Sequence, residues 1–274
     1  MDRAPRDPLE APLNARERLG RPEWLLLGVA GLVVFFGVWS LAAAVGAAPE
    51  QFLPPPWKVA EEFARLTREP FVGYTLQQHL LSSFTRFGMG FLLAVAIGVP
   101  LGLALGWFRW LDLIVSPLFD ALRFVAPIAW VPFAALWFGT GIGGPVLVIF
   151  TGAFPPCVIN TYRGARYVEN QLVEAARTLG AGHWQIITEV LLPASVPSIV
   201  AGLRVSAGLA WQSLVGAELI VASSGIGYLL VKGQASISTS IVMSGMIAIG
   251  IVGFAIDALL QRLEARIHRR RGRG

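Results

Sequence analysis

Glu174-Ala175-Ala176-Arg177-Thr178-Leu179-Gly180, followed ten residues later by Val190-Leu191-Leu192-Pro193, lies in a polar interlude between long apolar runs. The interlude extends from Tyr162 to Pro193. Its alanines, leucines and glutamates favour a helix, and Gly180 can adopt a positive φ and end that helix. Two small alanines leave a smooth surface for a partner to approach, and Glu174 offers its charge to an arginine across an interface. The pattern predicts a helical, water-exposed loop between two membrane spans.

The composition excludes a soluble globular protein. The 274 residues are 55% hydrophobic and 14% charged, whereas soluble domains carry about 25% charged residues. A membrane-spanning helix needs about 20 apolar residues, and no alternating pattern indicates a barrel. Charge-free runs occupy 24–49, 87–108, 124–162 and 233–256. We therefore predict an all-α integral membrane protein with six spans, at about 24–47, 82–107, 113–138, 145–161, 194–220 and 241–261.

The basic residues indicate the orientation of these spans. Residues 21–265 are expected to form one transmembrane domain, with the water-exposed loop at 162–193. If six spans alternate sides, fifteen of the 22 basic residues fall on one side, which the positive-inside rule makes cytoplasmic. Both termini and the Glu174 loop are then cytoplasmic, with a disordered tail at 1–20 and a basic tail at 266–274. A cleaved secretory signal is the alternative for the first span, but its apolar run is too long for one.

The sequence offers little chemistry of its own. The single cysteine, Cys157, excludes an intrachain disulfide, and His79, His183 and His268 are scattered without metal-ligand spacing. No Gly-x-x-x-x-Gly-Lys-[Ser/Thr] stretch occurs, so the chain lacks that means of binding nucleotide phosphates. The net charge of +5 reflects membrane topology rather than nucleic-acid binding. We expect no catalytic residue, no metal and no cofactor.

Two spans carry ridges of small residues at intervals of four. The ridges are Gly90, Ala94, Gly98, Gly102 and Gly106 in the second span, and Ala194, Ser198, Gly202, Ser206 and Ala210 in the fifth. Small residues let helix backbones approach closely in lipid, so the ridges predict helix–helix contacts. The alternative is that they line a passage. Pro127 and Pro132 predict a bend in the third span.

Charges in and near the spans are costly unless they pair or meet water. Asp120 and Arg123 are three residues apart and can pair on one helical face. Arg204 and Glu218 are expected on related faces of the fifth span, either in a pathway or gating role or in local pairs. Outside the spans, 57–69 predicts a short interfacial helix with Glu61–Arg65 and Arg65–Glu69 pairs.

The loop spacing Glu-Ala-Ala-x-x-x-Gly, then nine residues, then Val-x-Leu-Pro resembles the signature of permease subunits of binding-protein-dependent ABC importers. Other stretches are similar to the branch that imports nitrate, taurine, alkanesulfonates or bicarbonate, and the resemblance covers roughly residues 51–265. These stretches are Leu53-Pro54-x-Pro56, His79-Leu80-Leu81-Ser82-Ser83-x-x-Arg86, and Gly202-Leu203-Arg204 with Ala217-Glu218 and Gly225-x-Gly227-Tyr228. Pro127-x-x-Trp130-x-Pro132 with Leu136-Trp137-Phe138-Gly139 resembles the family's third span.

The resemblance implies a type I ABC importer permease fold in the bacterial inner membrane. It implies a second permease copy, two cytoplasmic ATPase subunits that bind the ATP, and a periplasmic substrate-binding protein. ATPase coupling is then assigned to Glu174, Ala175, Ala176, Leu179, Gly180 and Pro193. The translocation pathway is assigned to Pro127, Trp130, Pro132, Ser206, Gln212, Ser213 and Glu218.

The expected function is import of a small anion from periplasm to cytoplasm, coupled to the ATPase through 170–193. Taurine or another sulfonate comes first, followed by nitrate, then bicarbonate or an aromatic acid. One alternative is an ion-coupled secondary transporter, which predicts broken helices in symmetric halves. Another is an intramembrane enzyme, for which Cys157 or His183 would have to matter.

Overall fold

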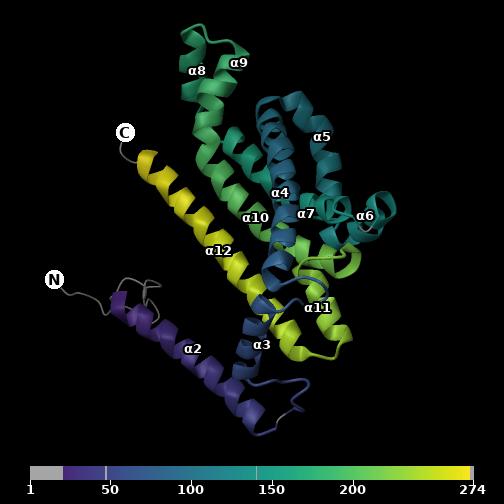
Figure 1. The fold of residues 1–274 in the computed structure, drawn as a ribbon. Coiled ribbons are helices and arrows are strands. Elements are labelled where there is room, and N and C mark those ends of the chain that lie inside the picture. The colour runs from purple at the N-terminus through teal and green to yellow at the C-terminus, as the bar shows by residue number, and fades with distance from the viewer. Residues whose placement is uncertain (1–20, 47, 140, 272–274) are drawn as a thin grey trace, which may run out of the picture. The chain divides into compact units, whose positions relative to one another are not determined.

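The computed structural model describes residues 21–46, 48–139 and 141–271. The tail expected at 1–20 lies outside these residues, as do 272–274, whereas 266–271 continue the last helix. Helices dominate the described chain (Figure 1). They are α2 (Arg21–Ala44), α3 (Pro56–Arg68), α4 (Leu76–Trp107), α5 (Arg109–Leu122), η1 (Pro127–Trp130), α6 (Val131–Phe138), α7 (Gly143–Arg166), α8 (Asn170–Thr178), α9 (His183–Gln185), η2 (Ile186–Leu191), α10 (Leu192–Val221), α11 (Ile226–Ala235) and α12 (Thr239–Arg271).

The chain divides into two compact units, Met1–Val59 and Ala60–Gly274. The first unit contains α2, whose described side chains are mostly exposed and apolar, as suits a helix that faces lipid. After α2, the chain is held locally by a hydrogen bond from Trp39 Nε1 to Pro54 O of 3.1 Å and by a Lys58–Glu50 ion pair.

Five described helices are long and apolar enough to cross a membrane, and a bent pair makes a sixth candidate. The pair joins α5 to η1 and α6 across an angle of 86°. Pro127 begins η1, and Ala126 before it has ψ 140°, as favoured for a residue that precedes proline, because the proline ring disfavours the helical region there. The predicted bend in the third span is confirmed, and it is a sharp break.

The centre of the second unit is α7, which packs against α4 on one side and α10 on the other. The small-residue ridge of α4 faces α7. A Cβ added at Gly102 would lie 2.6 Å from Thr161 Cβ, and one added at Gly106 would lie 2.5 Å from Ala165 Cβ. Gly202 of α10 likewise meets Asn160 of α7. Both ridges are helix–helix contact faces, as the four-residue spacing predicts.

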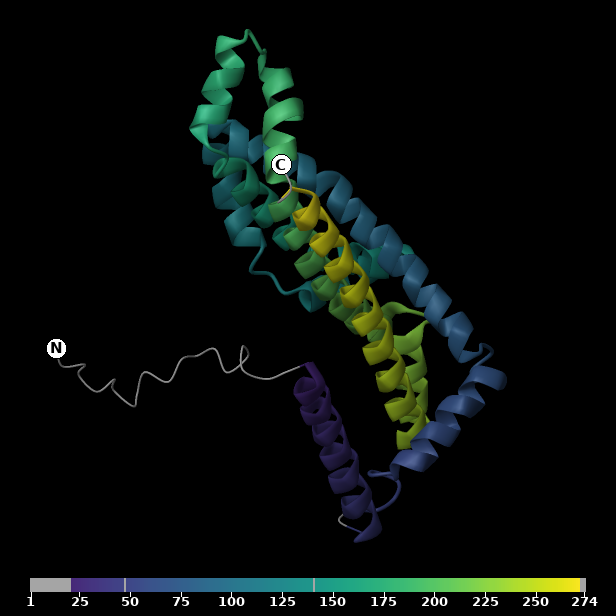
Figure 2. The same cartoon turned by 90° about the vertical axis from the view of Figure 1, so that its left-hand side faces the viewer.

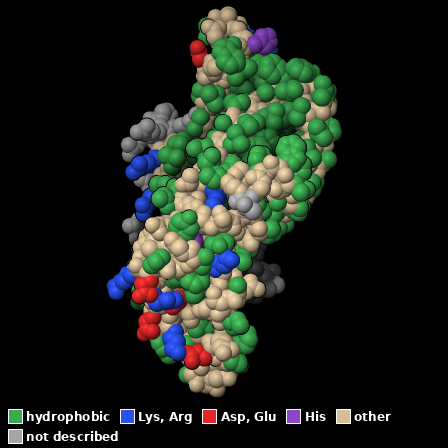
Figure 3. All heavy atoms as spheres, turned by 45° about the vertical axis from the view of Figure 1, so that its right-hand side comes forward, with side chains coloured by type: hydrophobic (Ala, Val, Ile, Leu, Met, Phe, Trp, Pro, Cys, Tyr) green, Lys and Arg blue, Asp and Glu red, His purple; other side chains and the backbone are tan. Residues whose placement is uncertain are grey.

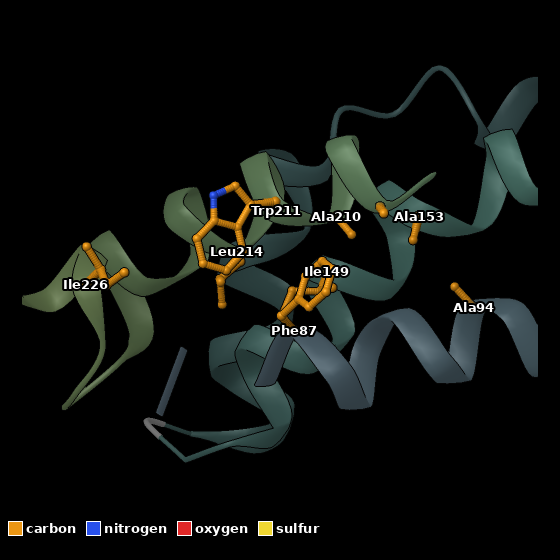
Figure 4. Packing of buried hydrophobic residues seen from close by; sticks show 9 residues of the cluster. Phe87, Ala94, Ile149, Ala153, Ala210, Trp211, Leu214 and Ile226 are labelled. Atoms are coloured by element: carbon orange, nitrogen blue, oxygen red, sulfur yellow. The ribbon is translucent and has the colours of Figure 1, made fainter. Parts of the chain in front are cut away.

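An apolar cluster fills the space where α4, α7, α10 and α11 meet (Figure 4). Phe87 and Trp211 pack edge to face with ring centroids 5.6 Å apart, and Trp211 Nε1 donates to Ile249 O at 3.2 Å. The ring therefore contributes apolar area while its N–H is satisfied. Ala94, Ile149 and Ala210 complete the contact between α4, α7 and α10.

A second cluster joins the elements at the opposite end of the unit from α8 and α9. Leu66 of α3, Leu76 of α4, Leu229 of α11 and Ile241 of α12 are buried together. On the exposed side of α3, Arg65 pairs with Glu62 at 2.5 Å and with Glu69 at 3.7 Å. The sequence prediction of a Glu61–Arg65 pair is wrong, because Arg65 pairs on that side with Glu62, three residues before it, instead of with Glu61, four residues before it.

Hydrophobic side chains cover the face over α5 and α6, whereas charged side chains gather near α3 (Figure 3). Leu113, Leu118, Phe124, Leu136 and Trp137 are each more than half exposed. Such a continuous apolar face is expected of a surface covered by lipid or by another membrane protein.

Gly102→Leu is expected to lower the melting temperature of the purified protein in detergent by about 5 °C, because overpacking costs roughly 1–3 kcal/mol. Gly88→Leu on the same helix is the matched control, since a Cβ there meets nothing within 4 Å. Both substitutions raise helix propensity equally. Equal melting temperatures for the two variants would contradict close packing of α4 on α7.

Candidate functional sites

A finger formed by residues 167–191 projects from one end of the second unit, and α11 lies at the other end (Figures 1 and 2). The first limb of the finger is α8, and Gly180 ends it with φ +84°. Gly180 N donates to Arg177 O and Ala181 N donates to Ala176 O, each at 3.0 Å. These two bonds close a Schellman turn, which needs the left-handed conformation that glycine adopts without strain. The prediction that Gly180 adopts a positive φ and ends the helix is confirmed.

The second limb of the finger is continuous with the fifth span. Gly182 N donates to Gln185 Oε1 at 2.9 Å, and from there α9, η2 and α10 form one helix, His183–Val221, of 39 residues. η2 is a π-helical turn, in which Leu192 N bonds back to Ile187 O. Pro193 has no N–H and its ring would clash with the carbonyl four residues earlier, so the wider turn accommodates it. Pro193 thus enters the span without interrupting the helix.

The first limb is joined to the fourth span less directly. α7 ends at Arg166, and Tyr167, Val168 and Glu169 separate it from α8. Glu169 has ψ 125°, outside the helical region. The finger is therefore joined to the fifth span by an unbroken helix and to the fourth span through a short non-helical link.

The residues assigned to coupling lie on the finger. Glu174, Ala175, Leu179 and Gly180 are exposed, as is Pro193 at the base of the finger, and Ala176 is half-buried. Leu172, Ala175 and Leu179 share one face of α8, and Leu179 is 88% exposed. Trp184 of the second limb is 74% exposed. The finger therefore presents an apolar face to its surroundings, which favours a protein partner.

A cavity of about 400 Å³ lies between the base of the finger and the ends of α4 and α7. Its lining includes Trp107, Arg166, Glu174 and Arg177, and the Arg177 guanidinium lies 5.9 Å from the centre of the Trp107 ring. Within the residues described, Glu174 makes no ion pair or hydrogen bond. Its carboxylate therefore stands at the edge of a basic cavity and is available to an external cation.

The residues assigned to the pathway fall in several places. Pro127, Trp130 and Pro132 lie at the break of the third span, where Val131 and Ala134 are buried against Val148 and Val221. Of the seven assigned residues, only Gln212 lines the cavity of about 190 Å³ between α10 and α12. Ser213 Oγ donates to Leu209 O at 2.7 Å. Ser206 is fully buried, and its hydroxyl makes no hydrogen bond within the described chain.

Glu218, the seventh, belongs to a buried cluster near the C-terminal end of α10. Its side chain is fully buried and pairs with Arg86 of α4, with Nη1 and Oε1 2.8 Å apart. Ser83 Oγ lies 2.8 Å from both carboxylate oxygens. Gly227 N donates to Oε2 at 3.0 Å, so the carboxylate also caps the N-terminus of α11. We call Arg86, Glu218 and their hydrogen-bonding partners the acid–arginine cluster.

The same cluster binds the loop that connects α10 to α11. Arg86 Nη1 donates to Ser224 O and Nη2 donates to Ser224 Oγ, each at 2.7 Å. Gly225 N donates to His79 Nδ1 at 3.1 Å, so Nδ1 carries no hydrogen and Nε2 donates to Phe71 O at 3.2 Å. Ile226 N donates to Ser83 Oγ at 2.9 Å. Three successive backbone amides are thus bound by side chains of α4 and α10.

Two glycines let the loop approach Glu218. Gly225 has φ +109°, and a Cβ there would collide with the Glu218 carboxylate. A Cβ at Gly227 would lie 2.5 Å from Glu218 Cβ. The Gly225-x-Gly227 spacing is therefore explained by close contact with one residue, Glu218.

Sequence reasoning did not pair Arg86 with Glu218, although His79, Ser83 and Arg86 recur at helical spacing on an otherwise apolar span. That spacing is the sequence signal that could have indicated a polar cluster on one face of this helix. Arg204, which the sequence placed on a face related to that of Glu218, pairs instead with Asp257 of α12, at 2.7 and 3.1 Å. The predicted Asp120–Arg123 pair is confirmed at 2.9 Å. Among the described residues, no group of three His, Cys, Asp or Glu side chains is arranged to hold a metal ion.

Known proteins resemble this chain over most of its length. Residues 94–273 match the family model of the binding-protein-dependent transport system inner membrane component. The taurine transport system permease protein TauC of Escherichia coli is 33% identical over 88% of this chain and 88% of its own. A putative aliphatic sulfonates transport permease protein of Bacillus subtilis is 34% identical over 92% of this chain and 88% of its own. The bicarbonate transport system permease protein CmpB of Synechococcus elongatus is 32% identical over 93% and 96%.

The fold is also shared with a solved structure. A chain of the MetNI methionine ABC transporter, in an inward-facing conformation, superposes with a TM-score of 0.62 at 18% identity, over 70% of this chain and 95% of that one. The named relatives are transport permeases rather than enzymes. This chain belongs to the family of binding-protein-dependent transport system inner membrane components, and it is a multi-pass permease of the ABC importer type.

Proposed function

We propose that the protein is the membrane-spanning subunit of an ATP-driven importer that moves a small oxyanion from periplasm to cytoplasm. Three relatives are named for taurine, aliphatic sulfonates and bicarbonate, and each of these compounds carries a negatively charged oxyanion group. Taurine or another sulfonate is our first candidate, and nitrate and bicarbonate follow. The observation that carries the proposal is the finger, which combines an exposed apolar face and a free Glu174 with a helix that continues into the fifth span.

A separate ATPase subunit docks on the finger in this proposal. The chain has no phosphate-binding loop sequence, so the ATP is bound by the partner and this subunit carries no cofactor. Leu179 and Ala175 pack against the ATPase, and Glu174 pairs with one of its basic side chains. Closure of the ATPase subunits then moves the second limb together with α10.

The finger end of the bundle is assigned to the cytoplasm. Arg109, Arg163, Arg166 and Arg177 all belong to the ends of helices at or beside the finger. The last turns of α12, which carry Arg262 and Arg266, approach the same end (Figures 1 and 2). Because basic residues concentrate on the cytoplasmic side of membrane proteins, we propose a cytoplasmic C-terminus, and six alternating spans would put the N-terminus on the same side.

A second copy of the chain completes the pathway, and a periplasmic binding protein delivers the anion to the α11 end. The exposed apolar face over α5 and α6 has the character of a surface shared by lipid and the second copy. In this arrangement the break at Pro127–Pro132 and the α10 residues Ser206, Gln212, Ser213 and Glu218 contribute to or support the pathway.

The proposal predicts that uptake needs three kinds of protein and ATP. Proteoliposomes would contain this chain and its partner ATPase, with the partner binding protein outside. Radiolabelled taurine, an alkanesulfonate, nitrate and bicarbonate are then offered separately. We expect uptake of one of these anions only with ATP inside the vesicles, and none without the ATPase or the binding protein.

A proton or sodium gradient without ATP is the decisive comparison. Uptake driven by either gradient through this chain alone would identify an ion-coupled secondary transporter and contradict the proposal.

A further inference from the structure

The helix His183–Val221 joins the two ends of the second unit, and each end carries a cluster of polar residues. The finger lies at its first end, and Glu218 lies one turn before its last residue. If the finger is driven by an ATPase, movement of this helix must also move whatever is fixed to Glu218. The inference that follows rests on the proposed function.

Glu218 is fixed to two other elements by directional bonds. Arg86 and Ser83 hold its carboxylate from α4, and the amide of Gly227 holds it from α11. Arg86 also binds both the carbonyl and the hydroxyl of Ser224 in the loop before α11. Because a hydrogen bond requires a particular distance and angle, these contacts fix the position of α11 along α4 and α10, which apolar packing alone does not do.

Stability alone gives no reason for a charged pair at this site. Burying both charges costs desolvation, and an apolar pair of similar volume is often equally stable or more so. Arg86 is 5% exposed, and its Nε makes no hydrogen bond within the described chain, so part of the desolvation cost of the pair is uncompensated. Buried ionisable groups in a membrane-spanning helix are functional candidates for this reason.

We propose that Arg86, Ser83 and Glu218 are positioning residues that fasten α11 and the outer half of α4 to α10. Movement of the finger is thereby transmitted to the end of the subunit where the anion enters. Without the acid–arginine cluster, α10 still moves with the ATPase, but α11 no longer follows it. ATP hydrolysis then continues while less anion is carried for each ATP consumed.

The principal test replaces the pair by apolar residues of similar size, Arg86→Met with Glu218→Leu, in the complete transporter. The measured quantity is the ratio of anion taken up to ATP hydrolysed, with the anion that the wild-type complex transports. We expect this ratio to fall about tenfold, which is the size of effect that a typical coupling free energy between two sites produces. The melting temperature and the affinity for the ATPase are expected to stay near wild type. Deuterium exchange at the amides of residues 225–227 is expected to accelerate in the same variant.

Two adjacent serines provide a matched comparison that leaves the charges in place. Ser83 Oγ contacts both oxygens of Glu218 and accepts from Ile226 N, whereas the hydrogen bond of Ser82 Oγ within the described chain is to Ser224 Oγ. Ser83→Ala is expected to lower the uptake-to-ATP ratio, and Ser82→Ala to leave it unchanged. If the double variant fails to fold, the comparison of Ser83→Ala with Ser82→Ala tests the proposal instead.

A wild-type ratio in the folded double variant, or in Ser83→Ala, would overturn the proposal and leave the cluster as packing alone. An equal loss in Ser82→Ala and Ser83→Ala would also overturn it. Failure of the proposed function looks different, because the wild-type complex itself would then show no ATP-driven uptake.

Discussion

Glu174→Arg is expected to abolish ATP-driven uptake while leaving the membrane domain folded. The side chain is exposed and makes no ion pair within the described residues, so its replacement removes no internal contact. It does place a third positive charge beside Arg166 and Arg177 at the edge of the same cavity. An arginine of the docking ATPase would then be repelled. Loss of such a charge pair weakens binding of the ATPase by roughly a hundredfold or more.

The measurement is the affinity of the purified permease for its ATPase, together with uptake in proteoliposomes and the melting temperature. Glu189→Arg is the matched control, because Glu189 is an exposed glutamate on the second limb outside that cavity. Normal ATPase affinity and uptake in Glu174→Arg would remove the coupling role from this residue.

Glu218→Leu is expected to destabilise the folded protein more than any other single substitution considered for this chain. The change leaves Arg86 buried with no opposite charge and removes the acceptor for Gly227 N. Breaking one side of a buried ion pair costs about 3–5 kcal/mol, which corresponds to a fall in melting temperature on the order of 10 °C. The melting temperature in detergent and the yield of folded protein report the effect.

Adding Arg86→Met to Glu218→Leu should restore most of the lost stability, because no unpaired charge then remains. Gln212→Leu, an exposed polar position on the same helix, is the control and should change the melting temperature little. A Glu218→Leu variant as stable as wild type would mean that the cluster is accessible to water and not buried as described.

The spans and the finger were predictable because their signals are local. Charge-free runs specify spans through the cost of placing charges in hydrocarbon. Gly180 specifies the end of α8 through its own backbone freedom, and Gly102 and Gly106 specify a contact face through their spacing. In each case the physical cause lies within a few residues along the chain.

The acid–arginine cluster was not predictable in the same way. Arg86 and Glu218 are 132 residues apart, and the sequence contains several other charges that either one could meet. The packing of α4 against α10 selects this pair, and the packing of α10 against α12 pairs Arg204 with Asp257.

The uninterrupted helix from finger to fifth span sets how far the finger stands from the bilayer. At 1.5 Å per residue, 39 residues extend about 58 Å. Hydrocarbon and headgroups together occupy only about 40–45 Å. Whether the helix is upright or moderately tilted, the tip of the finger lies beyond the headgroup layer. A water-soluble protein can bind it there without contacting lipid.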